Sequence, residues 1–507
     1  MASRCQPVRG YTAIRSRSAS HHPRERLVPG CSPLSPRVWW LSLLGLAVVL
    51  RWGVMIARPE QLTTDRDLYL GIANELREGH GYSTPETAVP TPTAFRPPLY
   101  PLLLVLTGGS RTGIAVLHLG LAVVMVLATG RAAEKLAGGT SPFPRLLAGG
   151  IVAIDPLLLL YSGQPMTETL CACLTAVLLW RMTASEPTPR DAMIEGLLWG
   201  LCLLARPTYA AGLVLCLVGR VLLRPANAAF PAISEQSPTF PRLRFGFMVV
   251  MTAIVVVAPW AIRNGVVFGK PIVTTTHGGY TLWLANNPVY YAEVVEGGDP
   301  AWNGESLQRW QSETNAEMDR LQIHGEVARD LWQGTRAKQF MANNPWRFVR
   351  ACGDRASTFW AIFPGRTADS GVPQPMLWII AGGYAAVWVG GIVALGRIAI
   401  RRSWAENWPA CSLVLGFFLV HLSTGLMYGC EPRSCPQWPF CWRWGYCGTT
   451  FRVVSDDTER RTTISIHITI PPSEGLSCRT TNPDAASSWP AAAAPGSTRR
   501  RSWSASN

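Results

Sequence analysis

Long apolar runs separated by short polar segments are the feature that most constrains how this chain folds. A helix that crosses a bilayer needs roughly 20 consecutive, mostly apolar residues. The runs lie at 39–57, 113–130, 146–160, 168–183, 192–204, 207–223, 245–262, 376–396 and 408–427. We therefore predict an all-α, polytopic membrane protein with about nine transmembrane helices.

The amount and placement of charge support this fold class and argue against nucleic-acid binding. Only 15% of the 507 residues are charged, against about 25% in a typical soluble domain. The formal charge is +14, but the basic residues fall in short loops and tails rather than on one amphipathic face. The cysteines show no spacing typical of a zinc site or a disulfide scaffold. We expect the lipid bilayer, and no nucleic acid, among the partners.

Arginine in the short connecting segments sets the predicted orientation. Cytoplasmic loops of membrane proteins are enriched in Lys and Arg, so segment 1–37, interpreted as a disordered basic tail, is placed in the cytoplasm. The two long connections, 58–96 and 263–375, then lie on the outer side, and interfacial helices are expected within them. The sequence predicts an integral, multi-pass protein of the bacterial inner membrane whose site faces the periplasm.

The C-terminal segment, 428–507, differs in composition from the rest of the chain. It contains five Cys, nine Arg and no Lys, and has no apolar run of spanning length. This composition indicates a frame-shifted or disordered tail, and we interpret its cysteines as a product of composition rather than as a metal site. The membrane domain is expected to cover 38–427.

Three acidic residues at the ends of apolar runs are candidates for catalysis. Asp65 and Asp67 follow the first run, at the start of a predicted amphipathic helix over 67–78, and Glu168 begins a run after the turn YSGQPMTE. A carboxylate can serve as a general base. The alternative is structural, because helix N-termini favour acidic residues. A carboxylate pair could also hold a divalent metal ion, although no ligand spacing demands one and no cofactor is assigned.

Three arginines are expected at the outer membrane interface, at the same depth as these acids. Arg96, Arg206 and Arg263 each lie where an apolar run meets an outer segment. The planar guanidinium binds phosphate through two parallel hydrogen bonds, which suits a lipid phosphate or pyrophosphate. The alternative for each arginine is an interfacial anchor.

These segments together resemble the GT-C superfamily of membrane glycosyltransferases, in the branch with protein O-mannosyltransferases and aminoarabinose transferases. The resemblance covers about 60–420 and rests on motifs that occur in the order of the family. They are Asp65 with Tyr69, then GHGY, FRPPLYP, YSGQPMTE, GLLWGLCLLARP and APWAIRNGVVFGKPIVTTTHGGYTLWLANNP.

The resemblance implies a polyprenyl-phosphate-linked sugar donor and an acceptor hydroxyl on an unknown glycan, lipid or protein. In the family an acid of the first outer loop is the catalytic base, a role that falls by position on Asp65, with Asp67 as the rival. The arginines would stabilise the leaving phosphate, and transfer would invert the anomeric carbon. Four residues within the motifs are assigned to substrate binding: Tyr69, Tyr100, Asn264 and Asn286. Segment 272–288 would line the acceptor side, and 305–362 would close over it.

Two other functions are compatible with a polytopic chain. A transporter or flippase of a lipid-linked substrate should show paired, broken helices and inverted repeats, and the sequence shows no internal repeat. An inactive, truncated homologue is the alternative that the unusual tail suggests.

Overall fold

The structure is a computed structural model, and it describes residues 35–85, 89–139, 141–183, 188–223, 242–297, 305–362 and 374–424. The predictions for residues 1–34 and 428–507 lie outside the described residues. Within them, regular structure is helical except for one pair of two-residue strands, so the predicted all-α class is confirmed. The strands β1 (Ser83–Thr84) and β2 (Thr91–Pro92) are antiparallel, with Ser83 opposite Pro92.

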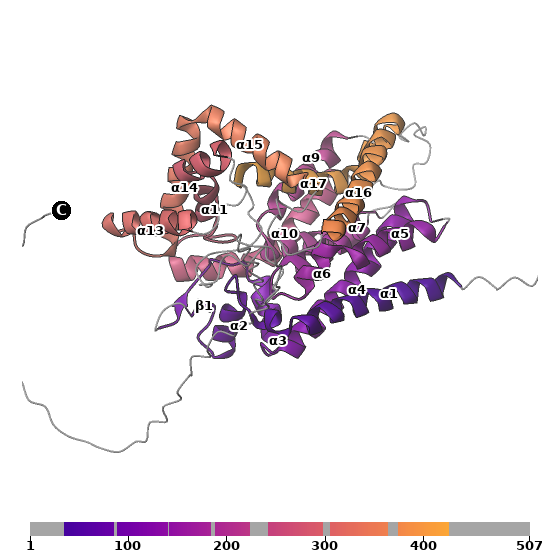
Figure 1. Cartoon of the computed structure of the whole chain (residues 1–507), viewed down its shortest axis with the longest axis horizontal. Coiled ribbons are helices and arrows are strands. Elements are labelled where there is room, and N and C mark those ends of the chain that lie inside the picture. The colour runs from indigo at the N-terminus through magenta and orange to yellow at the C-terminus, as the bar shows by residue number, and fades with distance from the viewer. Residues whose placement is uncertain are drawn as a thin grey trace, which may run out of the picture. The chain divides into compact units, whose positions relative to one another are not determined.

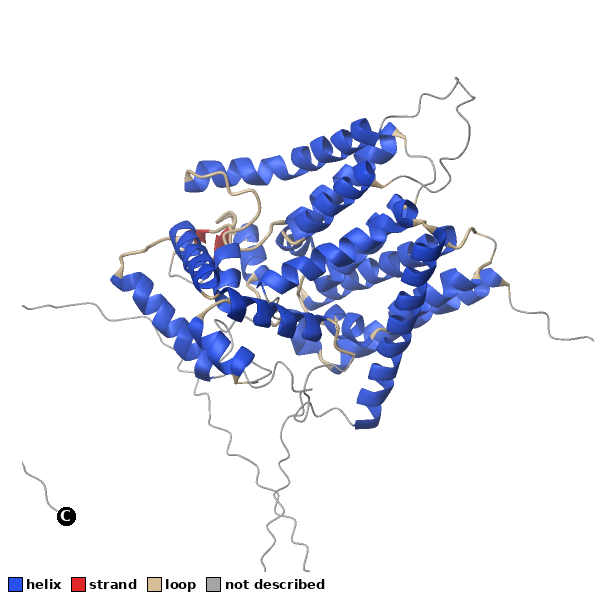
Figure 2. Ribbon diagram, turned by 90° about the horizontal axis from the view of Figure 1, so that it is seen from above, coloured by secondary structure: helices blue, strands red, loops and turns tan. Residues whose placement is uncertain are grey.

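The helices fall along the chain into two groups, before and after residue 270 (Figures 1 and 2). The first part of the chain contains α1 (Pro36–Ala57), η1 (Pro59–Thr63), α2 (Tyr69–Arg77), α3 (Leu99–Leu106), α4 (Arg111–Leu136), α5 (Phe143–Ile154), α6 (Pro156–Ser162), α7 (Glu168–Met182), α8 (Pro189–Ala205), α9 (Tyr209–Leu222) and α10 (Arg242–Phe268). The second part contains α11 (Gly278–Ala285), α12 (Pro288–Tyr290), η2 (Tyr291–Glu296), α13 (Glu305–Arg320), α14 (Glu326–Asn343), α15 (Pro345–Phe359), α16 (Gln374–Arg401) and α17 (Trp404–Thr424).

Five of the described helices, α1, α4, α10, α16 and α17, are long and apolar enough to cross a membrane. A sixth span is formed if α5 and α6, which meet at an angle of 55°, are counted as one broken segment. The predicted number of nine is not confirmed, because three of the apolar runs form shorter helices. These are α7, α8 and α9, with 15, 17 and 14 residues.

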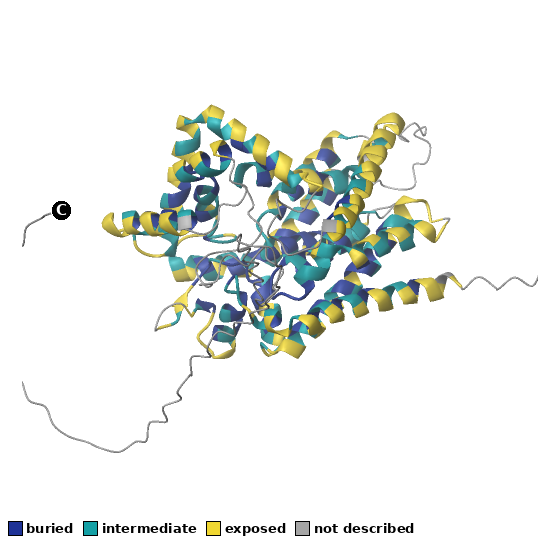
Figure 3. Ribbon diagram, viewed as in Figure 1, coloured by how far each residue is buried: buried dark blue, intermediate teal, exposed yellow. Residues whose placement is uncertain are grey.

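The long helices have many exposed positions (Figure 3), and many of these carry large apolar side chains. Leu41 and Val49 on α1 are each 66% exposed, and Ile379 on α16 is 75% exposed. Water-soluble proteins rarely expose contiguous apolar patches of this kind. In a bilayer the same side chains face lipid, so this surface supports a membrane-embedded protein.

Glycine allows α8 and α10 to approach closely. A Cβ on Gly196 would lie 2.5 Å from the main-chain oxygen of Val249 and 2.7 Å from Cβ of Thr252, and a Cβ on Gly200 would lie 2.6 Å from Cβ of Val256. Small residues four apart are a common device for packing helices in membranes. The motif GLLWG therefore has a structural role in this contact.

Replacing Gly196 with Val is expected to separate α8 from α10 and lower stability by about 1–3 kcal/mol, the usual effect of overpacking. The readout is the apparent melting temperature of the detergent-solubilised protein. Gly265→Val is the matched control, because this glycine is also helical but no atom lies within 4 Å of its added Cβ. Equal melting temperatures for the two variants would contradict the role of Gly196.

A buried arginine supports the break between α5 and α6. Arg51, at 0% exposure on α1, donates from Nη1 to the oxygen of Ala153 at 3.0 Å and from Nη2 to that of Val152 at 3.0 Å. Pro156 removes a donor from the helix at this point. Asp155 in turn accepts from the main-chain nitrogen of Leu158 at 2.9 Å. Arg51 and Asp155 together supply partners for main-chain groups that the break leaves free.

Removing this arginine should destabilise the protein more than removing an exposed one. Arg51→Met leaves the buried carbonyl of Ala153 and the partly buried carbonyl of Val152 without their donor. A buried unsatisfied group costs about 1–3 kcal/mol. Arg37→Met on the same helix is the control, since Arg37 is exposed. Thermal unfolding in detergent would measure both variants. A loss for Arg51→Met no greater than for Arg37→Met would refute this interpretation.

Candidate functional site

The candidate site begins at the N-terminus of α2. Leu68 precedes this helix with φ of 63°, in the left-handed region, and this turn brings Asp65 back over the helix end. Oδ2 of Asp65 accepts a hydrogen bond from the main-chain nitrogen of Gly71 at 2.6 Å. Oδ1 is buried and has no partner among the described residues. Asp65 thus caps α2, which is the structural role given above as the alternative to catalysis. Its second oxygen is not used by the helix.

Burial raises the pKa of the Asp65 carboxyl above its ordinary value, although the main-chain N–H groups of Gly71, Leu70 and Tyr69 and the charge of Arg96 act in the opposite direction. A general base works best when its pKa lies near the operating pH. The environment of Asp65 therefore shifts this carboxyl toward, rather than away from, base catalysis.

Asp67 is held by an arginine. Its carboxylate is 3.2 Å from Nη2 of Arg96, and its main-chain oxygen accepts from Nε of Arg96 at 2.9 Å. The two side chains are only 8% and 9% exposed. Arg96 also lies over the ring of Tyr69, with its central carbon 5.3 Å from the ring centre. Asp67 and Arg96 form a buried pair, and the pairing leaves Asp67 less available to a substrate than Asp65.

A second acid–arginine pair lies next to the first. Glu168, the first residue of α7, is bound by Nη2 of Arg206, and Nε of Arg206 donates to Oγ1 of Thr167 at 3.0 Å. The Arg206 side chain is 34% exposed, against 17% for that of Glu168. Arg206 is therefore the more accessible of the two arginines in these pairs.

The two pairs meet at Tyr69. Burial raises the pKa of its phenol to about 12, and the charges of Arg96, Asp67, Arg206 and Glu168 all act on this group. Residues from four separate parts of the chain are therefore brought together around one tyrosine.

Tyr100 and His118 support Tyr69 from the side of the apolar helices. The rings of Tyr69 and Tyr100 pack edge to face at 5.3 Å. Nδ1 of His118 is 2.7 Å from the oxygen of Ser162, and its Nε2 is 2.8 Å from the Tyr100 hydroxyl. A carbonyl oxygen only accepts, so in a neutral imidazole Nδ1 carries the proton and the Tyr100 hydroxyl donates to Nε2. Sequence analysis missed His118, although an ionisable residue within an apolar run is a signal for function.

Arg263 belongs to a different set of contacts. It donates from Nη1 to the oxygen of Thr93 at 2.7 Å and from Nη2 to that of Tyr82 at 2.8 Å, so it fixes the strand pair to α10. The neighbouring Asn264 accepts from Arg263 at 2.9 Å and donates to the oxygen of Ile272 at 3.0 Å. Of the three predicted arginines, Arg96 and Arg206 meet around Tyr69. Phosphate binding by Arg263 and substrate binding by Asn264 stay predictions.

Asn286 lies in a third cluster, at the end of α11. Its Nδ2 donates to the oxygen of Ser423 at 2.9 Å, and its Oδ1 accepts from Tyr291 at 2.9 Å and from Arg355 at 3.2 Å. Arg355 also donates to the oxygen of Leu422 at 2.8 Å. These contacts join α11 and α15 to the C-terminal end of α17. Substrate binding by Asn286 likewise stays a prediction.

Glu326 links the two long connecting segments. It accepts from Oγ1 of Thr93 at 2.6 Å and from the nitrogen of Ala94 at 2.9 Å, and it is also bound by Oγ1 of Thr276. A cavity of about 340 Å³ lies beside this link and is lined from both segments, including Leu68, Ile72 and Phe95 on one side and Thr276 on the other. We name it the inner cavity. Its lining includes Thr276 and Tyr280 from 272–288, which was expected to line the acceptor side, and Glu326 and Asp330 from 305–362, which was expected to close over it.

One group in the described part of the chain has the residue types and spacing to hold a metal ion. Ligand atoms of Glu75, Glu78 and His80 lie within 4.8 Å of one another. The 2.8 Å contact between His80 Nδ1 and Glu75 already accounts for the closest pair as a hydrogen bond. The group is separate from the Asp65 and Asp67 pair, and a divalent metal ion at that pair stays a prediction.

The fold and these clusters define a membrane-embedded, largely helical protein with one buried and one partly buried acid–arginine pair close to the ends of its apolar helices. No protein-family model matches the chain, and no curated protein matches it.

Proposed function

We propose that this protein transfers a sugar from a polyprenyl-phosphate-linked donor to an acceptor hydroxyl, with inversion at the anomeric carbon. The observation that carries the proposal is the meeting of Asp67–Arg96 and Glu168–Arg206 around Tyr69, with Asp65 beside Asp67. This arrangement offers a carboxylate beside guanidinium groups, and the transfer reaction needs both a base and a group that stabilises a leaving phosphate.

Each residue has a step in the proposed reaction. Asp65 takes the proton of the acceptor hydroxyl, whose oxygen attacks the anomeric carbon. The bond from that carbon to the phosphate oxygen breaks, and Arg206 stabilises the negative charge of the released polyprenyl phosphate. Arg96 holds Asp67 and the face of Tyr69, and thereby fixes the shape of the site. The proposal also includes the nine-span topology and a site on the non-cytoplasmic face, which rest on the apolar runs and on the arginines of the short loops.

The transporter alternative gains no support from the broken helix. The freed main-chain groups between α5 and α6 are bound by Arg51 and Asp155. They are therefore not presented to a substrate, unlike the broken helices that form transporter sites.

The direct test of the proposal is release of polyprenyl phosphate from a panel of polyprenyl-phosphate sugars by the full chain in lipid nanodiscs. Mannose, glucose and aminoarabinose donors would be offered with glycan, lipid and peptide acceptors. We expect acceptor-dependent release from at least one donor, with the sugar recovered on the acceptor in inverted configuration. Retention of configuration would argue against direct attack assisted by Asp65.

The rate of transfer should depend on pH through Asp65. The ordinary carboxyl pKa is 3.8, and burial raises that of Asp65. Because the base acts as the carboxylate, the rate should fall as pH decreases through this raised value. The raised pKa also affects the free energy of unfolding, because the folded state binds the Asp65 proton more tightly than the unfolded state does. The contribution of Asp65 to that free energy therefore decreases as pH rises from 3.8 through its raised pKa. An acidic limb at or below 3.8 in initial-rate profiles would contradict the assignment.

A further inference from the structure

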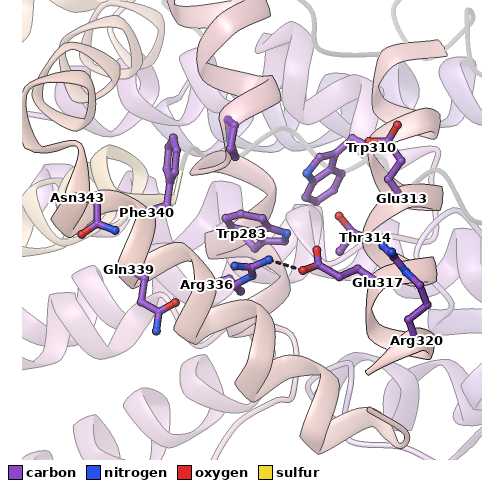
Figure 4. Close-up of a pocket in the computed structure, with 11 residues that line it drawn as sticks. Trp283, Trp310, Glu313, Thr314, Glu317, Arg320, Arg336, Gln339, Phe340 and Asn343 are labelled. Carbon is purple, nitrogen blue, oxygen red and sulfur yellow. Dashed lines mark hydrogen bonds and ion pairs between the residues drawn. The ribbon is translucent and has the colours of Figure 1, made fainter. Parts of the chain in front are cut away.

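A second and larger cavity lies between α11, α13 and α14, with a volume of about 520 Å³ (Figure 4). We name it the outer cavity. Small-molecule sites usually measure about 300–1,000 Å³ and combine apolar walls with a few polar groups. None of the residues around Tyr69 lines this cavity, so the proposed chemistry does not account for it.

Aromatic side chains form one wall of the outer cavity. The rings of Trp283 and Trp310 are 6.4 Å apart and tilted by 45°, and Phe340 packs on Trp283 at 82°. Both tryptophans are anchored in the hydrophobic cluster of these helices and are 8% and 4% exposed. Nε1 of Trp283 is buried and has no hydrogen-bond partner among the described residues. The wall is thus rigid and includes an unused donor.

Polar side chains of α13 and α14 complete the lining of the cavity, and we call them the polar wall. They carry no net charge. Two acids, Glu313 and Glu317, are balanced by two arginines, Arg320 and Arg336. Arg336 is already bound to Glu317 (Figure 4). The amides of Gln339 and Asn343 add both donors and acceptors. This balance does not favour a phosphate, which would meet two carboxylates.

The combination of walls matches a neutral saccharide. The C–H face of a sugar ring carries partial positive charge and stacks on the negative face of an aromatic ring. Of the three aromatic side chains here, Phe340 is only partly buried and is the most exposed. Hydroxyl groups both donate and accept hydrogen bonds, and the polar wall offers carboxylates, guanidinium groups and amides to them. A peptide lacks this pairing of one apolar face with a rim of hydroxyls.

The outer and inner cavities are both lined by residues of α11 and α14. On α14, Gln333 lines the inner cavity and Arg336 lines the outer one. On α11, Tyr280 lines the inner cavity and Trp283 lines the outer one. Residues three apart on a helix are neighbours on one face. A ligand with several linked units could therefore occupy both cavities.

We infer that the outer cavity is a subsite for a neutral saccharide unit of the acceptor, distant from the hydroxyl that reacts. That the bound saccharide belongs to the acceptor rests on the proposed function. That the cavity binds a saccharide rests on its aromatic and polar walls alone. The acceptor is then an oligosaccharide or a glycan-bearing molecule.

Binding is measured without donor, using the full chain in lipid nanodiscs and calorimetric titration with mannotriose and maltotriose. Inorganic phosphate and an acidic peptide are the comparison ligands. We expect saturable binding of at least one trisaccharide and none of the comparison ligands at this cavity. Gln339→Ala should weaken saccharide binding by about 2–10-fold, the loss of one hydrogen bond, and Trp283→Phe should also weaken it because the indole donor is removed.

Gln308→Ala is the matched control, since Gln308 is exposed on α13 but does not line the cavity. Equal affinity of the Gln339→Ala and Gln308→Ala variants overturns the inference, as does binding of phosphate or peptide in place of a saccharide. The donor-free design separates the two proposals. Saccharide binding without any sugar transfer supports the subsite and refutes the transferase, whereas transfer with unaltered acceptor KM in both cavity variants refutes the subsite.

Discussion

Asp65→Asn is expected to reduce sugar transfer by roughly 10²–10⁴-fold, the usual effect of losing a general base. The amide of Asn keeps an oxygen that can accept from the main-chain nitrogen of Gly71, as Oδ2 of Asp65 does at 2.6 Å. The cap of α2 therefore survives, while the carboxylate is lost. Donor binding should be unchanged, because Arg96 and Arg206 remain. The measurement is the initial rate of transfer together with donor affinity.

The cap is also the alternative role of Asp65, and the same variant separates the two. If Asp65 only caps α2, Asp65→Asn keeps nearly full activity. Asp67→Asn is the companion variant, because it breaks the buried pair with Arg96. Removing one partner of a buried pair costs about 3–5 kcal/mol, so this variant should lower the melting temperature. Full transfer by Asp65→Asn with loss of transfer, but not of stability, in Asp67→Asn would make Asp67 the base.

Arg206→Met is expected to lower the rate by roughly 10²–10³-fold, the effect of removing one group that stabilises developing charge. Arg206 is the most suitable of the three arginines for this role, since it lies in the cluster and its side chain is 34% exposed. Arg206→Lys should lie between the wild type and Arg206→Met, because Lys retains the charge but not the planar fork. Transfer rate and donor affinity are both measured.

Arg350→Met on α15 is the control, because Arg350 is exposed. Arg263→Met should mainly loosen the strand pair, since this guanidinium is bound to main-chain oxygens. Unchanged donor binding and transfer in variants of Arg96, Arg206 and Arg263 would remove the phosphate-binding hypothesis.

The sequence predicted where the helices lie better than it predicted how long they are. Each apolar run forms helix, but the run at 146–160 is divided at Asp155 and Pro156, and the break is stabilised by Arg51 from about 100 residues earlier. Hydropathy cannot indicate that partner. It also treats α8 as a span, although its 17 residues end at Ala205, just before Arg206.

The sequence also predicted part of the site. The level shared by Asp65, Arg96, Glu168 and Arg206 follows from where the apolar runs end, and the structure brings these residues together. The ends of the apolar runs also place Arg263 at this level, but they could not indicate that Arg263 would bind main-chain oxygens of another segment. Such partners depend on tertiary packing. The outer cavity was not foreseen at all, because its lining comes from four helices, α11 to α14, whose tryptophans and glutamates have no diagnostic spacing.

The most direct test of the central claim is the fate of a donor that carries one label on the sugar and another on the polyprenyl chain. The full chain is placed in sealed proteoliposomes with the donor and an acceptor. The account predicts that the sugar label moves to the acceptor while the lipid label is recovered as polyprenyl phosphate, and that Asp65→Asn stops this separation. Movement of both labels together across the membrane would identify a flippase, and bound donor whose labels never separate would identify an inactive protein. Either result would contradict the account.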